Sequence, residues 1–255
     1  MKQSTFIVVL TASALAIGFV IYEYIIGSPA NFKDAARAIP INLMGQMYHG
    51  GILVSVLIAL SIMDFAIIIE RTISLKKSSG KGGTDKFLKR ILDLTKSDNY
   101  EEAISECKTQ KGAVANILGA ALARYTEIKD NEKIDEEKKF AEVQRAVEEA
   151  TMLETPLLEK NLIALSTIAS IATMVGLLGT TIGMIRAFKA LAQAGAPDAL
   201  ALATGISEAL VNTAGGLFVA ILGIVAYNVF INNVDNFTYM VDEASFNVMQ
   251  ILRSK

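Results

Sequence analysis

Apolar residues of this chain gather in four long runs that charged side chains rarely interrupt. A helix needs about 20 mostly apolar residues to cross a bilayer. The pattern therefore predicts four membrane-spanning helices, at residues 1–26, 50–70, 161–192 and 200–232. The third and fourth runs are longer than a bilayer requires, so these helices should tilt or project from the membrane.

The first run also has features of a cleaved signal peptide. Lys2 precedes the apolar stretch, and Ala14-Leu15-Ala16 is similar to a cleavage site. The apolar stretch nevertheless continues from Ala16 to Ile26, where a mature domain would normally begin. We therefore favour a retained membrane helix over a cleaved leader.

The longest polar stretch, residues 71–160, has helical periodicity. Its apolar side chains recur on one side of two expected helices, with Phe87, Leu88, Ile91, Leu92 and Leu94 in the first and Phe140, Val143, Val147 and Ala150 in the second. The second helix should lead into the third membrane run, with a kink at Pro156. The sequence thus predicts an all-α, multi-pass membrane protein whose long transmembrane helices extend into a cytoplasmic helical bundle.

The distribution of basic residues predicts the orientation, because loops rich in lysine and arginine stay in the cytoplasm. A dense basic cluster follows the second run, consisting of Arg71, Lys76, Lys77, Lys81, Lys86, Lys89 and Arg90. We therefore expect the N-terminus, residues 71–160 and a tail at 233–255 in the cytoplasm, and the loops at 27–49 and 193–199 in the periplasm. Arg186 and Lys189 oppose this trend. They should reach lipid headgroups, with a role at the mouth of an ion path as the alternative.

Composition argues against several classes of function. The chain is 52% hydrophobic and 20% charged, with a formal net charge of −2, whereas nucleic-acid binders normally carry a basic excess. It has a single histidine, His49, and a single cysteine, Cys107. These residues cannot form a disulfide, a usual metal site or a catalytic dyad within the chain. We therefore expect no enzyme activity, metal or cofactor, and set aside an intramembrane protease.

Polar side chains follow one face of the third run and one face of the fourth. In the third run, Ser166, Ser170, Thr173, Leu177, Thr180 and Met184 recur at steps of three or four, beside a row of small residues, Gly176, Gly179 and Gly183. In the fourth run, Thr204, Glu208, Asn212 and Gly215 share a face, while Ala209, Thr213, Gly216 and Ala220 share its neighbour. The small residues should simply let helices approach.

Two carboxyls interrupt the apolar runs. A carboxyl inside a membrane span is costly and commonly marks an ion or proton path, so Glu208 is the main functional candidate. The alternative is that Glu208 lies close enough to the membrane surface to reach headgroups. Asp64 is a weaker candidate, since it should approach the cytoplasmic interface or pair with a cation there.

Motifs in the last two runs resemble the MotA/TolQ/ExbB family of proton-channel proteins, most closely its ExbB branch. The matching stretches are GLLGTTIGMIRAF (Gly176–Phe188), GISEALVNTAGGL (Gly205–Leu217), AYNVF (Ala226–Phe230), ERTISL (Glu70–Leu75) and LEKNLIALSTIASIA (Leu158–Ala172). The resemblance extends over about residues 51–233. The paired GLLGT and EAL-x-x-T motifs in successive helices are its most specific part.

The resemblance implies a pentamer in the bacterial inner membrane, around the membrane helices of ExbD- or TolR-type partners. Protons would load an aspartate of the partner, and in the ExbB branch the work would reach outer-membrane importers through TonB. Thr180, Glu208 and Thr213 match the family's ion-path residues by motif position, and Thr173, Thr204 and Asn212 are further pore-lining candidates. Besides these proteins, the expected partners are membrane lipids, and not nucleic acid.

Some features depart from the family pattern and leave alternatives open. Family members often have proline where this chain has Thr173, Thr204 and Leu222, so its helices should be straighter. The first run is an addition to the family's three-helix plan. A TolQ-type envelope-maintenance motor, another motor of this family and a non-conducting scaffold remain as alternatives to the ExbB-type function.

Overall fold

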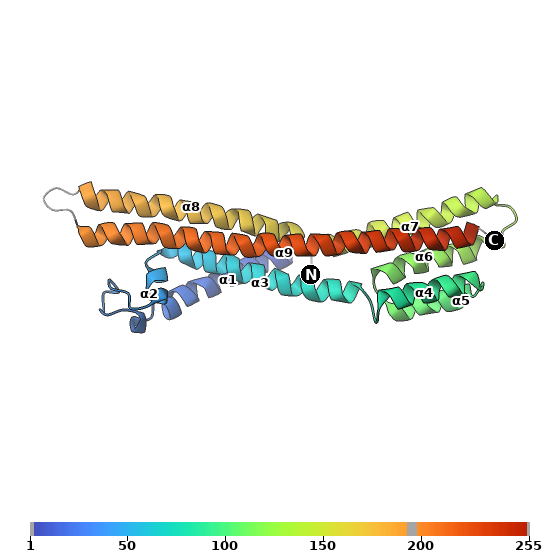
Figure 1. Cartoon of the computed structure of the whole chain (residues 1–255), viewed down its shortest axis with the longest axis horizontal. Helices are drawn as coiled ribbons and strands as arrows, with labels where there is room; N and C mark the ends of the chain where they lie inside the picture. Colours follow the sequence, from blue (N-terminus) through green and yellow to red (C-terminus); the bar gives the residue numbers. More distant parts are fainter. Residues whose placement is uncertain (1–2, 193–197, 254–255) are drawn as a thin grey trace. The chain divides into compact units, whose positions relative to one another are not determined.

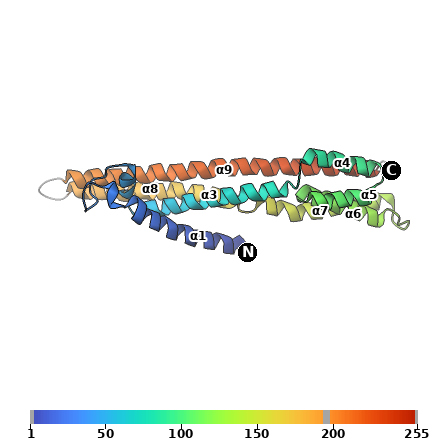
Figure 2. The ribbon, with the colours of Figure 1, turned by 90° about the horizontal axis from the view of Figure 1, so that it is seen from below.

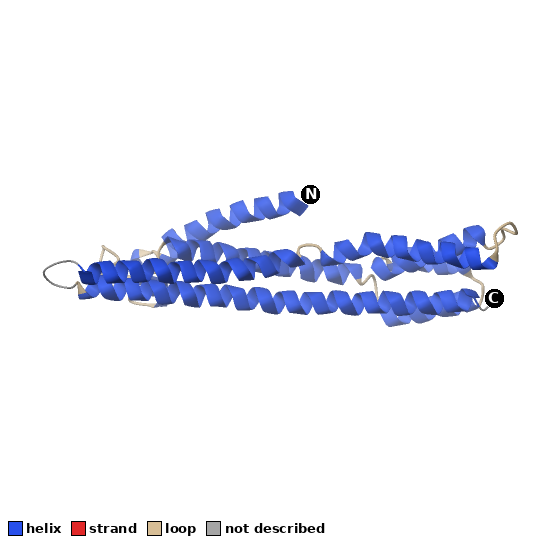
Figure 3. Cartoon of the chain, turned by 90° about the horizontal axis from the view of Figure 1, so that it is seen from above, coloured by secondary structure: helices blue, strands red, loops and turns tan. Residues whose placement is uncertain are grey.

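The computed structural model describes residues 3–192 and 198–253. Every regular element in those residues is a helix, and the only other backbone pairing is one isolated bridge between Phe32 and Pro40 (Figure 3). Four helical stretches are long and apolar enough to cross a membrane: Thr5–Ile26, Ile52–Ser78, Glu136–Ala192 and Ala199–Arg253. The prediction of an all-α, multi-pass membrane protein is confirmed. Most of the predicted 193–199 loop lies outside the described residues.

The chain folds as two compact units. The first combines Met1–Ile69 with Asn161–Val229, and the second combines Glu70–Lys160 with Phe230–Lys255. The first unit holds the apolar runs, whereas the second holds the predicted cytoplasmic region together with the tail. Two helices, α3 (Ile52–Ser78) and α9 (Ala199–Arg253), contribute residues to both units.

The first unit is built from α1 (Gln3–Val20), α8 (Leu162–Ala192) and the membrane parts of α3 and α9. Helices α8 and α9 run side by side, while α1 leans away from its neighbours toward its N-terminus (Figures 1 and 2). Side chains on α1 such as Val8, Ile17 and Phe19 are therefore about half exposed within the chain. Lipid or further protein can cover such an apolar surface in a membrane.

Small residues bring α8 and α9 into close contact. A Cβ added to Gly216 would lie 2.6 Å from the carbonyl oxygen of Ala172 and 2.9 Å from Cα of Gly176. A Cβ on Gly183 would lie 2.6 Å from the carbonyl oxygen of Gly205. Larger side chains would force the helices apart, so this row serves backbone packing, as predicted.

The end of α1 is tied to the connection that follows it. The helix continues as one π-helical stretch, η1 (Ile21–Ile26), before the short helices η2 (Pro29–Asn31) and α2 (Leu43–Tyr48). The Asn31 amide donates to the carbonyl oxygens of Ile25 and Ile26, at 2.9 and 2.8 Å, and so satisfies groups at the helix end. The rings of Tyr22 and Tyr48 stack with centroids 4.9 Å apart. The segment that follows the first helix is thus folded against the end of that helix.

The second unit contains α4 (Thr84–Lys96), α5 (Tyr100–Gln110), α6 (Ala113–Ile128), α7 (Glu136–Glu159) and the end of α9. Helix α6 packs against both α5 and α7, and α4 packs against α5. The predicted apolar stripes supply Phe87 and Ile91 of α4 and Val143 of α7 to the core. Residues 71–160, which were predicted to be helical from their periodicity, thus form packed helices.

Two helix ends add detail that the sequence did not predict. The predicted tail at 233–255 is the continuation of α9 to Arg253, with buried side chains at spacings of four and three: Phe230, Val234, Phe237, Val241, Ala244 and Val248. Helix α7 continues through Pro156 to Glu159, so the predicted kink there stays a prediction; the helix ends before Asn161, whose φ is +64°.

Cys107 should resist thiol reagents in the folded protein. It is 4% exposed on α5, and burial, with a smaller contribution from the charge of Glu106, raises its thiol pKa from 9.0 to about 12. Because the thiolate is the reactive form, maleimide should leave Cys107 unmodified near neutral pH and modify it after unfolding. Its contribution to stability is complete below pH 9 and is lost as the pH rises toward 12.

Mass spectrometry after a timed maleimide reaction would measure this protection. In a Cys107→Ala background, Ser105→Cys places a thiol at an exposed position on the same helix and should react at once. Equal rates for the two thiols in folded protein would contradict the buried, protonated state of Cys107.

Candidate functional site

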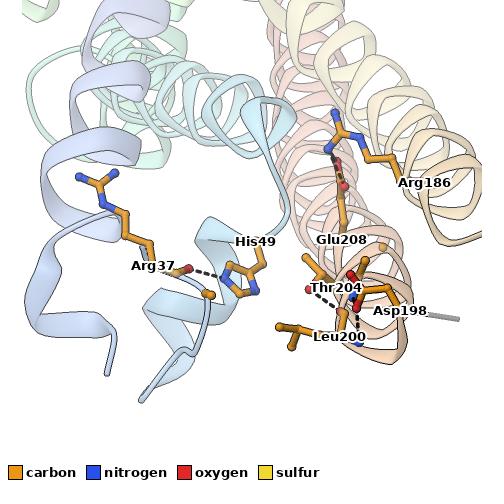
Figure 4. A pocket seen from close by; sticks show the side chains of 10 residues that line it. Arg37, His49, Arg186, Asp198, Leu200, Thr204 and Glu208 are labelled. Carbon is orange, nitrogen blue, oxygen red and sulfur yellow. Dashed lines mark hydrogen bonds and ion pairs between the residues drawn. The ribbon is translucent and has the colours of Figure 1, made fainter. Parts of the chain in front are cut away.

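Glu208 forms the most prominent polar contact of the membrane unit. Its side chain is 6% exposed on α9 and pairs with Arg186 of α8. One guanidinium nitrogen, Nη1, lies 2.7 Å from each carboxylate oxygen (Figure 4). The Arg186 side chain is itself 62% exposed, so the pair joins a buried carboxylate to a cation at the surface of the chain.

Glu208 lies near the N-terminal end of α9, away from the apolar middle of the helix, and this end is capped. The carboxylate of Asp198 accepts hydrogen bonds from the backbone N–H groups of Leu200 and Ala201, both at 3.0 Å. Such a cap satisfies donors that the first helical turn leaves unpaired. Glu208 follows nine residues after Ala199, about 14 Å along the helix.

The turn before α3 closes over Glu208 from the other side. Gly51 has φ of +73°, and a Cβ there would lie 2.9 Å from Oε1 of Glu208. The buried amide of Asn212 donates to the carbonyl oxygen of Gly50 at 2.7 Å and to that of Glu208 at 2.9 Å. Glycine at position 51 therefore combines a left-handed backbone with close approach to the carboxylate.

A hollow of about 420 Å³ opens beside this pair. Arg37 and His49 of the connection after α1 line it, together with Thr204, Glu208 and other residues near the ends of α8 and α9 (Figure 4). Arg37 donates to Glu23 at 2.8 Å and to the hydroxyl of Tyr48 at 2.7 Å, while Nε2 of His49 lies 2.8 Å from the carbonyl oxygen of Arg37. The connection after α1 and the start of α9 thus both contribute residues to this hollow.

The structure brings only some of the predicted residues to this hollow. Glu208 and Thr204 line it, and Asn212 lies one helical turn behind Glu208. Thr173, Thr180 and Thr213 do not line it. All four threonine hydroxyls donate to carbonyl oxygens of their own helices, at Ala169, Leu177, Leu200 and Ala209 for Thr173, Thr180, Thr204 and Thr213 in turn.

Among the described residues, the hydroxyl groups of these threonines make no hydrogen bond from one helix to another. Thr180 lies on the partly exposed face of α8, while Gly176, Gly179 and Gly183 on the same helix are buried. Each hydroxyl oxygen keeps lone pairs that can accept from water or from another subunit. The polar stripe of α8 is therefore available for a partner, whereas the glycine row is occupied by α9.

Sequence reasoning missed three components of the site. It predicted that Arg186 reaches lipid headgroups or lies at the mouth of an ion path, but not that Arg186 bonds to Glu208. It also assigned no role to the Gly50-Gly51 turn or to His49. These residues are distant from Glu208 in the sequence, so no local sequence pattern could indicate the contacts. The one available signal was that Arg186 and Glu208 were both predicted near the same membrane surface.

Of the two alternatives predicted for Asp64, the structure contradicts pairing with a cation. Its carboxyl group is completely buried in the first unit, and neither oxygen has a hydrogen-bond partner among the described residues. It therefore does not pair with a cation at the interface.

A bundle of membrane-length helices with a buried carboxylate at one end is a pattern typical of integral membrane proteins that carry an ion or proton path. Residues 110–243, more than half of the chain, match the family model described as "MotA/TolQ/ExbB proton channel family". The chain belongs to this family. The matched range includes Arg186, Glu208 and the four threonines, and excludes α1 and Asp64.

Named relatives come from both branches that the sequence left open. The Tol-Pal system protein TolQ of Pseudomonas aeruginosa is 32% identical over 177 residues, which cover 68% of this chain and 74% of that protein. TolQ of Haemophilus influenzae is 30% identical over 177 residues, covering 69% of this chain and 77% of the relative. The biopolymer transport protein ExbB of Pseudomonas putida is 31% identical over 191 residues, or 74% and 57% of the two chains.

Proposed function

We propose that this chain is the proton-channel and stator subunit of an inner-membrane motor that uses the proton motive force, with an ExbD-type partner, to energise TonB-dependent outer-membrane transport. The observation that carries the proposal is the buried Glu208 carboxylate, paired with Arg186 beside an open hollow. Membership of a proton-channel family gives this carboxylate a functional context.

Glu208 is the proposed entry residue of the ion path, where a carboxylate can attract cations. Thr180 and Thr213 are the proposed hydroxyls farther along the path, with Thr173, Thr204 and Asn212 as further lining residues. A hydroxyl oxygen that donates to its own helix can still accept a hydrogen bond from a hydrated proton. The exposed polar stripe of α8 supports this arrangement, since it leaves Thr180 available to a partner helix.

The proposed assembly is a pentamer around partner helices, with the N-terminus in the cytoplasm. The basic cluster after the second membrane run supports that orientation, because it would hold the second unit inside the cell. The hollow at Glu208 would then open toward the periplasm, the side from which protons enter along their gradient. The exposed apolar surfaces of α1, α8 and α9 suit lipid and neighbouring copies.

A TolQ-type envelope-maintenance motor is the second candidate, since relatives named TolQ match over more than two thirds of this chain. The same site would serve both motors, so the distinction lies in what receives the work. A neighbouring gene for a TonB-like protein would support transport, and one for a Pal-like protein would support envelope maintenance. A pure scaffold is less compatible with a buried ion pair beside a hollow.

Substitution of the proposed ion-path residues should strongly reduce energy-dependent uptake without dissociating the complex. With the ExbD-type partner co-expressed, Thr180→Ala and Glu208→Ala should each reduce energy-dependent uptake at least about tenfold, a change equivalent to about 1.4 kcal/mol. Complex assembly should remain near that of the unsubstituted chain, because the Thr180 hydroxyl contacts only its own helix among the described residues.

Thr181→Ala provides a matched control for the hydroxyl. Thr181 is the adjacent threonine, is exposed, and also donates to its own helix, at 2.7 Å from the carbonyl oxygen of Leu178. It should retain uptake. Full uptake in both Thr180→Ala and Glu208→Ala would refute the proposed ion path and leave the polar stripes as packing features.

A further inference from the structure

Asp64 is a buried carboxyl group that the proposed ion path does not use. It lies on α3, twelve residues after Ile52 and about 18 Å along the helix axis. Its exposure is 0%, and both carboxyl oxygens lack hydrogen-bond partners among the described residues. By contrast, Glu208 has two bonds from a guanidinium group.

Three helices enclose this carboxyl group. A Cβ on Gly223 of α9 would lie 3.3 Å from Oδ2 of Asp64, 3.1 Å from Cβ of Ala169 and 3.2 Å from the carbonyl oxygen of Leu165. The last two residues belong to α8. The polar atom that α8 presents at Gly223 is thus a carbonyl oxygen, an acceptor that cannot donate a hydrogen bond to a carboxylate.

The facing segments carry no cation that could balance a negative charge. Residues 162–185 of α8 contain no titratable side chain, and residues 209–234 of α9 contain only Tyr227. On α3, the next charged residues are Glu70 and Arg71, which hydrogen-bond to each other at 2.7 Å. Helix α1, which approaches α3 at Gly18, is free of titratable residues from 5 to 20.

An isolated carboxylate in such surroundings is strongly disfavoured, whereas a neutral acid is tolerated. The surroundings also restrict the ligand. The carboxyl is closed to the surface within this single chain, so a side chain of another subunit has no access to it without separation of the helices. A metal ion would need several oxygen ligands, but a proton needs none beyond the carboxyl itself.

We propose that Asp64 is a proton-binding site of the channel subunit itself, loaded and unloaded during the ion-driven cycle. This inference rests on the proposed motor function. The carboxylate takes a proton from a water molecule or hydronium ion to form the neutral acid, and later returns that proton to water. Because Asp64 is enclosed, each exchange requires α3, α8 and α9 to part enough to admit water, which couples proton binding to helix movement.

The position of Asp64 makes it distinct from Glu208. Gly223 lies fifteen residues after Glu208 on α9, about 22 Å along the helix. The two carboxyls therefore belong to different levels of the membrane unit, with Asp64 nearer the basic cluster. A proton that leaves Asp64 on that side would complete a passage begun near Glu208.

An apolar carbodiimide tests the protonated state directly. Dicyclohexylcarbodiimide adds to a protonated carboxyl group, whose proton passes to the reagent's nitrogen. In membranes that contain the assembled complex, it should modify Asp64 near neutral pH, as read by peptide mass spectrometry. Asp64→Asn should remove the modification. Glu23 and Glu208, each paired with an arginine, are internal controls and should be modified at least about tenfold more slowly, a difference equivalent to about 1.4 kcal/mol. Absence of Asp64 modification under conditions that label Glu208 would overturn the proposal.

Energy-dependent uptake tests whether the bound proton is used. Asp64→Asn keeps the shape of the side chain but cannot exchange a proton, and should reduce uptake at least about tenfold with the complex intact. Asp64→Glu should restore part of it. Full uptake in Asp64→Asn would overturn the proposal, while loss of uptake in Glu208→Ala in the same assay would leave the proposed function standing. If Asp64→Asn fails to assemble, infrared spectroscopy of the unsubstituted complex with labelled aspartate provides a second test. The band of the protonated carboxyl group should disappear at raised pH. A band that persists throughout would overturn the proposal.

Discussion

Arg186→Ala is expected to impair both the stability of the membrane unit and ion-driven work. The substitution removes two charge-assisted hydrogen bonds of 2.7 Å and leaves the buried Glu208 carboxylate without its cation. Loss of a partner from a buried charged group costs about 1–3 kcal/mol. The exposed position of Arg186 places the expected cost toward the lower end of that range, because water can partly replace the guanidinium.

Thermal unfolding of the purified complex and energy-dependent uptake would measure the two effects. Lys189→Ala is the matched control, since Lys189 is an exposed cation one helical turn away on α8. It should change stability by less than about 0.5 kcal/mol. Glu208→Gln combined with Arg186→Ala should cost less than the sum of the single changes, because each single change already breaks the pair. Additive costs would contradict a coupled pair.

Arg71→Ala is expected to destabilise the second unit by about 1–3 kcal/mol, the range for losing hydrogen bonds of a buried charged group, because Glu70 is 31% exposed and water can partly replace its partner. Arg71 is 1% exposed, and its Nε donates to Glu70 at 2.7 Å. Its Nη1 donates to the carbonyl oxygens of Leu157 and Leu158, both at 3.3 Å, in the last turn of α7. A cation is favourable at that end of a helix, where carbonyl groups lack partners within the helix.

Arg90→Ala is the appropriate comparison, because it removes the same side chain from the same unit. Arg90 is 57% exposed and lies 3.5–3.7 Å from Glu106 and Glu102, so its loss should cost less than about 1 kcal/mol. Urea or thermal unfolding of the complex, followed by circular dichroism, would separate the two values. Similar midpoints for Arg71→Ala and Arg90→Ala would show that burial of Arg71 contributes little.

The membrane helices were predictable because each contains its own signal. An apolar run of about 20 residues has few alternatives to a membrane helix, whatever its neighbours are. The glycine row of α8 was equally readable, since small residues at steps of three or four form one face of a helix. Its role in close packing against α9 agrees with that prediction.

The end of the chain was less apparent although a signal was present. Residues 233–255 were predicted only as a tail, yet the apolar positions from Phe230 to Val248 alternate at spacings of four and three. This spacing is typical of a helix with one buried seam. The polar residues between these positions hid the pattern, because the membrane run before it has a much stronger apolar signal.

The break between α7 and α8 shows how tertiary contacts contribute to a helix end. Proline removes one backbone donor and commonly ends or kinks a helix, which is why a kink was predicted at Pro156. Helix α7 nevertheless continues to Glu159, and its last-turn carbonyls at Leu157 and Leu158 accept from Arg71. A residue 86 positions away from Leu157 thus helps to stabilise the end of this helix.

The all-helical class and the four membrane runs could be read from the sequence because hydrophobicity and helical period act locally, and the motifs indicated the family. The role of Glu208 in an ion path stays a prediction. Tertiary packing decided which cation meets Glu208, where Asn212 donates, and that the Asp64 oxygens have no hydrogen-bond partner among the described residues. Those outcomes depend on the approach of helices that are distant in sequence. A carboxyl group's chemistry follows from its neighbours, and only packing places Arg186 beside one carboxyl and an apolar wall around the other.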